Sequence, residues 1–175
     1  MALYSTAPIL LRTGNPTMTA IIIIVSVAFM ALLFYLGIRS RNKLIDEGKI
    51  ILRKSDFMRS AEIFTLDPPD PAAVVAAVKA FDYADMRVSM KGSSEKQQFA
   101  FTGSSWGAQL YKQDSDEKAK YRFEFTNWKS SDGSVKDETN MNKLLTAVEK
   151  MFIGFDPNTQ VTTVPLELKT KHHLF

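Results

Sequence analysis

One run of residues, Met18 to Ile38, decides how the rest of this chain can be placed. It is written MTAIIIIVSVAFMALLFYLGI, and it lies in a longer stretch, from Thr13 onward, that contains no charged residue. A helix that rises about 1.5 Å per residue needs roughly 20 apolar residues to cross a hydrocarbon layer about 30 Å thick. Only three residues of the run carry a hydroxyl, too few for the polar face of a soluble helix. The run therefore predicts a transmembrane helix over residues 18–38, preceded by a short extracytoplasmic tail, residues 1–17.

Two kinds of leader peptide are disfavoured by the residues around this run. A cleaved signal peptide has an apolar run of about 7–15 residues followed by a small-x-small cleavage site. Here the run is longer, and RSRNK follows it at residues 39–43. A type IV pilin leader has a glutamate just inside the apolar run, and this run contains none. An uncleaved, single-pass anchor is the favoured interpretation.

Basic residues are concentrated on one side of the run. Arg12 is the only basic side chain in residues 1–18, whereas six basic residues follow the run. Because basic flanks are retained in the cytoplasm, we predict a cell-membrane protein with its N-terminus outside and its C-terminal domain in the cytoplasm. The same cluster would also suit contact with anionic lipid. Its members are Arg39, Arg41, Lys43, Lys49, Arg53 and Lys54.

Charge and cysteine content exclude several classes of function. The net charge of +3 is more than accounted for by that basic cluster, and the charges after residue 60 are nearly balanced. A nucleic-acid-binding domain would carry a basic patch of its own, so nucleic acid is not a predicted partner. The chain has no cysteine, which excludes disulfides, cysteine-based zinc sites, Fe–S clusters and thiol catalysis.

The remaining chain divides into a basic juxtamembrane segment, residues 39–59, and a domain, residues 60–175. The first helix should continue past the membrane toward Glu47, with Gly48 as its stop. Asp70 followed by Pro71 is typical of a helix start, and the apolar spacing beyond it predicts a helix over 71–84. A second helix is predicted over 139–155, with an apolar stripe along one face.

Alternating apolar and polar residues predict strands over 61–66, 87–91, 97–102, 106–112, 120–128 and 161–169, with turns between them. Pro165 cannot donate a ladder hydrogen bond, so the last strand should lie at a sheet edge. The predicted fold class is α+β: a transmembrane helix, then a small antiparallel sheet of about 4–6 strands with two helices packed on one face.

The segment GSSWG, residues 103–107, matches the G-x-S-x-G pattern of an α/β-hydrolase nucleophile. That motif requires a strand before the serine and a helix after it. Here the residues on both sides alternate as strands do, and the only histidines are His172 and His173 at the C-terminus. We therefore interpret GSSWG as a hairpin turn and predict that the protein is not an enzyme.

Metal and cofactor sites are likewise not predicted. The adjacent histidines would point to opposite faces of a strand, and no third ligand accompanies them. The acidic turn of Asp114, Asp116 and Glu117 lacks the glycine and the later ligands of an EF-hand loop. No phosphate-binding or dinucleotide-binding glycine motif occurs in the chain. No cofactor and no metal are predicted.

Aromatic residues crowd the middle strands, and three interpretations of them are open. They can form the core beneath the helices, line a pocket for a hydrophobic ligand between sheet and helix, or stack on bases. The element order is loosely similar to that of helix-grip and TBP-like α+β domains, which fixes no function. The residues concerned are Phe99, Phe101, Trp106, Tyr121, Phe123 and Phe125.

These observations together favour a membrane-anchored, non-enzymatic protein. Its cytoplasmic α+β domain is expected to serve as a protein-interaction or accessory module of a membrane complex, with the lipid bilayer and a protein partner or oligomer as its partners. The alternative is a membrane-tethered, helix-grip-like module that binds a lipid or another small apolar molecule.

Overall fold

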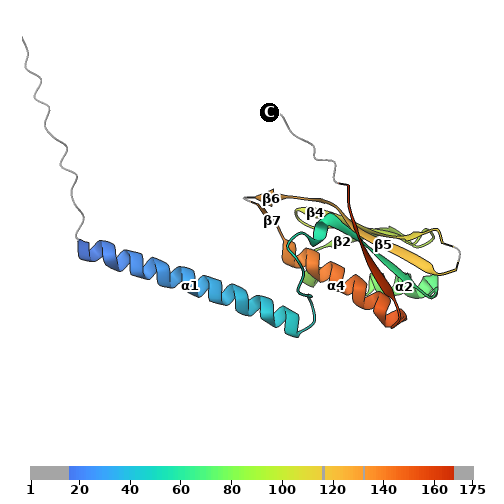
Figure 1. Ribbon diagram of the computed structural model, residues 1–175, viewed down its shortest axis with the longest axis horizontal. Coiled ribbons are helices and arrows are strands. Elements are labelled where there is room, and N and C mark those ends of the chain that lie inside the picture. The colour runs from blue at the N-terminus through green and yellow to red at the C-terminus, as the bar shows by residue number, and fades with distance from the viewer. Residues whose placement is uncertain (1–15, 116, 132, 168–175) are drawn as a thin grey trace, which may run out of the picture. The chain divides into compact units, whose positions relative to one another are not determined.

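The computed structural model describes residues 16–115, 117–131 and 133–167 and divides into two compact units, which join between Leu44 and Ile45 (Figure 1). The first unit is formed by helix α1, Pro16–Asp46, which carries the apolar run and continues into the second unit. Within the described residues it is the one helix long and apolar enough to span a membrane, a test that a signal sequence also passes. The helix ends as predicted, because Gly48 takes a positive φ of 65° and its N–H donates to Ile45 O at 2.8 Å.

The second unit contains a six-stranded antiparallel sheet, which confirms the predicted α+β class. The strands are ordered β2-β3-β4-β5-β1-β8, so the first strand lies between the fifth and the last. The edge position of β8 agrees with the prediction from Pro165. The bounds are β1 Ser60–Leu66, β2 Ser89–Ser93, β3 Gln98–Thr102, β4 Trp106–Gln113, β5 Ala119–Trp128 and β8 Gln160–Pro165. A short hairpin, β6 Ser130–Ser131 with β7 Ser134–Val135, follows β5.

The helix predicted over 71–84 is divided into two. Helix α2, Pro71–Lys79, begins where expected, with the Asp70 carboxylate accepting from Ala72 N–H at 3.0 Å. The Asp82 carboxylate then caps a new helix, α3, Tyr83–Met86, by accepting from Asp85 N–H at 2.9 Å. A local capping side chain thus competes with continuation of the first helix. Arg87 takes a left-handed φ of 51°, which delays the next strand from residue 87 to residue 89.

The core lies between the sheet and these helices, together with helix α4, Glu138–Phe155. Phe152 of α4 stacks on Phe64 of β1 with ring centroids 4.8 Å apart and lies 4.7 Å from the Tyr121 ring of β5. Figure 1 shows α4 running along the sheet. The main helical contributions to this core are Val74, Val78, Met86, Met141, Leu144, Leu145, Val148 and Phe152.

The GSSWG segment is the turn between β3 and β4, two adjacent antiparallel strands. Gly103 N–H donates to Trp106 O at 2.9 Å and closes the turn. A Cβ atom on Gly103 would lie 2.4 Å from the Trp106 ring, so the indole occupies the space of a side chain. The Ser105 hydroxyl donates to Lys136 O at 3.3 Å, and Trp106 Nε1 donates to the Asp137 carboxylate at 2.9 Å. These bonds attach the turn to the segment that precedes α4.

We predict that Gly103→Ala destabilises the domain by about 1–3 kcal/mol, because the added methyl must displace a buried indole ring. Gly154→Ala is the matched control: a Cβ there meets no atom within 4 Å. In a helix this change stabilises by up to about 1 kcal/mol. Chemical denaturation followed by tryptophan fluorescence measures both. Equal effects of the two variants would contradict the role assigned to Gly103.

Candidate functional site

The six basic residues that follow the apolar run have different surroundings in the structure. Arg39, Arg41 and Lys43 are exposed on α1, and Lys54 is exposed in the segment that follows. Lys49 forms ion pairs with Glu47 and Asp85, both at 3.5 Å. Arg53 is directed into the domain, so its guanidinium is not part of the basic surface.

Arg53 is the centre of a buried polar cluster beneath α4. Its Nη1 lies 3.4 Å from Glu62 Oε1 on β1, and its Nη2 donates to Glu149 Oε2 on α4. The third donor, Nε, bonds to Asn142 Oδ1 at 3.1 Å. The two glutamate side chains and the arginine side chain are each only 11–12% exposed. One guanidinium therefore serves two carboxylates from two different elements.

Asn142 extends this cluster to the backbone of the segment after α1. Its Nδ2 donates to Ile51 O at 2.8 Å, while its Oδ1 accepts from Arg53 and from the Thr146 hydroxyl, the latter at 3.1 Å. Asn142 and Thr146 are both buried. A buried amide that makes both kinds of bond fixes the segment in position as well as satisfying its own polar groups.

With both glutamates ionised, the cluster would contain two negative charges and one positive charge. A proton on one glutamate would balance these charges. Burial, together with the hydrogen bond and repulsion from Glu149, raises the pKa of Glu62 to about 8, against the lowering effect of Arg53. Glu62 Oε2 is buried and has no hydrogen-bond partner among the described residues. A carboxylic acid at Glu62 would turn that oxygen into a donor and leave one positive and one negative charge in the cluster.

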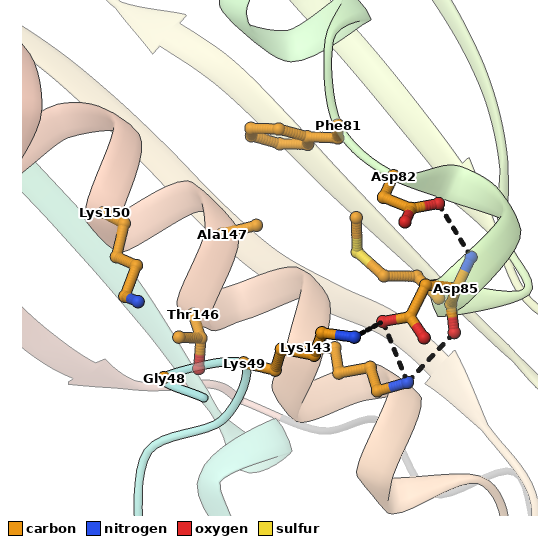
Figure 2. Close-up of a pocket in the computed structure, with 10 residues that line it drawn as sticks. Gly48, Lys49, Phe81, Asp82, Asp85, Lys143, Thr146, Ala147 and Lys150 are labelled. Atoms are coloured by element: carbon orange, nitrogen blue, oxygen red, sulfur yellow. Dashed lines mark hydrogen bonds and ion pairs between the residues drawn. The ribbon is translucent and has the colours of Figure 1, made fainter. Parts of the chain in front are cut away.

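A small pocket lies on the other side of Thr146, between α3, α4 and the turn after α1 (Figure 2). Its volume is ≈ 200 Å³, and its apolar wall includes Phe81, Met86 and Ala147. Figure 2 shows Asp85 between the ammonium groups of Lys49 and Lys143. Lys143 Nζ lies 3.1 Å from the Asp85 carboxylate and 3.0 Å from Asp85 O.

The Asp85 ion pairs give the pocket a fixed charge pattern. The neighbouring lysines, Lys143 first, hold the pKa of the Asp85 carboxyl below its usual value. Asp85 in turn raises the pKa of Lys49. Lys150, the third lysine of the pocket, is exposed, and its Nζ occupies the space where a Cβ of residue 48 would lie. The reason for a glycine at position 48 is its positive φ of 65°, since the end of the lysine side chain can move aside.

The six aromatic residues singled out in the sequence are all buried in the common core, each no more than 2% exposed. Four of the six rings contact one another: Phe101 lies 6.4 Å from Phe123, and Trp106 and Phe123 each meet Phe125 edge to face, with centroids 5.8 Å and 5.2 Å apart. The Tyr121 hydroxyl donates to Gln97 Oε1 at 2.6 Å. The structure thus places these rings beneath the helices.

The other sequence candidates add no further site. Among the described residues, no three His, Asp or Glu side chains are grouped closely enough to hold a metal ion. His172, His173 and Asp116 lie outside the described residues. The Arg53 cluster was missed from sequence, although Glu62 stands at an inward position of a predicted strand, in alternation with Phe64 and Leu66.

Comparison of the chain with protein families, with curated proteins and with solved structures finds no match. The assignment of function therefore depends on the molecule itself.

We predict that the proton on Glu62 makes stability depend on pH. The folded chain holds it up to about pH 8, whereas an unfolded glutamate releases it near 4.5. The free energy of unfolding should therefore fall as pH rises between these values, by at most about 1.4 kcal/mol per pH unit. Glu62→Gln, which cannot ionise, should flatten this slope in chemical denaturation curves of the detergent-solubilised chain.

Glu124→Gln is the matched control, because Glu124 lies on the opposite face of the sheet from Glu62 and is bonded to Arg122 and Gln109. This variant should retain the slope of the parent chain. A slope unchanged in Glu62→Gln would show that Glu62 is ionised in the folded protein.

Proposed function

We propose that this protein is a single-pass, membrane-anchored, non-enzymatic module. Its α+β domain would lie in the cytoplasm and bind a protein partner, as an accessory part of a membrane complex. The length of α1 and the exposure of its apolar side chains support the anchor. The basic residues after the span support the cytoplasmic side.

The observation that carries the interaction role is the outer face of the sheet. The apolar residues of each strand point to the core, so the alternate residues form an opposite face. Across this face, Ala100 pairs with Gln109, and Gln109 with Glu124. A parallel row crosses five strands through Gln98, Tyr111, Arg122, Ile63 and Thr162.

The polar side chains of this face are already ordered. Glu124 accepts from Gln109 Nε2 at 2.5 Å and from Arg122 Nε at 2.7 Å. The Arg122 and Glu124 side chains are only 22% and 15% exposed, and neither residue belongs to the hydrophobic core cluster. Side chains that are held before binding lose little further entropy in a complex, which favours a protein interface.

The ligand-binding alternative is supported by the pocket beside Asp85. Its apolar wall and lysine ammonium groups suit a small molecule with an apolar part and an acidic group. However, a volume of ≈ 200 Å³ is below the roughly 300–1,000 Å³ of sites for drug-sized ligands. The aromatic residues expected to line a helix-grip pocket are occupied by contacts with one another. We therefore rank this function second.

The sidedness of the domain can be tested with single cysteines, because the natural chain has none. We expect Ser94→Cys, in an exposed turn, to react with a membrane-impermeant maleimide only after cells are permeabilised. Ser5→Cys in the N-terminal tail should react in intact cells. Labelling of Ser94→Cys in intact cells would overturn the cytoplasmic placement, and recovery of the chain in the soluble fraction would overturn the anchor.

The role of the outer face can be tested by a pair of identical substitutions. Ala100→Arg places a long cation on that face, beside Gln109, whereas Ala76→Arg places it on an exposed position of α2. We expect Ala100→Arg to reduce recovery of cross-linked partners from intact cells at least tenfold, equivalent to about 1.4 kcal/mol of binding. Ala76→Arg should have little effect. Equal recovery with both variants would contradict an interface on this face.

A further inference from the structure

Two large apolar side chains are exposed in the segment that links α1 to the sheet. Ile51 is 43% exposed and Leu52 is 72% exposed. Their neighbours face the other way: Ile50 is 4% exposed, and Arg53 enters the buried cluster. The segment therefore has two inward side chains, at residues 50 and 53, and two outward side chains between them, at residues 51 and 52.

The outward pair is held in place by specific bonds. Asn142 Nδ2 binds Ile51 O, and Asn142 Oδ1 binds Arg53 Nε. Turning Ile51 or Leu52 into the domain would break these bonds and leave two buried glutamates without their cation. Such an unpaired buried charge is unfavourable, so the fold keeps the two apolar side chains in solvent.

The position of this pair along the chain restricts what can cover it. Ile51 follows Ile38, the last residue of the apolar run, by 13 positions, and α1 is helical through Asp46. With about 1.5 Å per helical residue and at most about 3.6 Å per extended residue, Ile51 lies within about 30 Å of the end of the run. The surface of a membrane spanned by α1 would therefore be no more than about 30 Å from this pair.

The charges near the pair favour an anionic surface. Lys54 is exposed beside it, and Arg39 and Arg41 are exposed between the apolar run and the pair. Lys49 contributes less, since it is shared between Glu47 and Asp85. Basic side chains next to exposed apolar ones are typical of segments that bind the interface of anionic membranes.

We propose that Ile51 and Leu52 insert into the headgroup region of an anionic membrane and hold the domain at its surface. This proposal rests on the proposed transmembrane role of α1. In this proposal the Arg53 cluster holds the two apolar side chains in their outward orientation. The contact is a second, weaker attachment that the span makes effectively intramolecular.

The test uses the full-length chain with Ser55→Cys, an exposed position next to the pair, labelled with an environment-sensitive fluorophore. The protein is reconstituted in nanodiscs whose lipids carry a bromine quencher near the headgroup. In discs that contain phosphatidylglycerol we expect about twofold quenching and a blue shift, with less of both in phosphatidylcholine alone. The added substitutions Ile51→Ser and Leu52→Ser should remove the quenching. An Ala76→Cys label on α2 should show none.

A label at Leu36→Cys, inside the apolar run, reports on the span in the same discs. Quenching at Leu36 without quenching at Ser55 would overturn the surface contact and leave the span in place. No quenching at Leu36 would show that the anchor itself is wrong. Quenching at Ser55 that survives the serine substitutions would also overturn the proposal. A blue shift that appears in detergent only at high protein concentration would overturn it as well, because it would show that a second copy of this chain covers the pair.

Discussion

The bonds of the Arg53 guanidinium hold together parts of the chain that are far apart in sequence. They join the segment after α1 to β1 through Glu62 and to α4 through Glu149 and Asn142. The same contacts determine that Ile50 is buried and that Ile51 and Leu52 are not. The path of residues 50–53 along the domain thus depends on one cation with three acceptors.

Such a cluster is stable only when every member is satisfied. Moving charges out of water costs several kcal/mol per ion, and a second carboxylate beside a single guanidinium adds repulsion. Here the Asn142 amide bonds to the guanidinium and to Ile51 O. Burial raises the pKa of Glu62, which favours the neutral acid and so reduces the repulsion between the two glutamates.

The local periodicities of the sequence predicted most of the elements but not their long-range assembly. The uncharged run predicted α1, the alternation of apolar and polar residues predicted the strands, and Pro165 predicted that β8 lies at an edge. The division of the helix over 71–84 was missed because Asp82 was counted as a helix residue, although aspartate is also a capping residue. The Arg53 cluster was missed because its members are up to 96 residues apart. Its local signals were polar residues at buried positions, Glu62 in β1 and Asn142, Thr146 and Glu149 in α4.

The core of the domain also explains why its surfaces are the place to seek a function. Rings from three strands and α4 fill the space that a helix-grip pocket would occupy, so apolar burial there serves folding. Outside the core, the ordered polar face of the sheet and the pair Ile51 and Leu52 are small surfaces that would bind weakly in solution. If α1 anchors the chain, it confines both to the vicinity of a membrane, where a weak contact needs no high bulk concentration to be occupied. In that case the anchor is what would allow so small a domain to act through its surface.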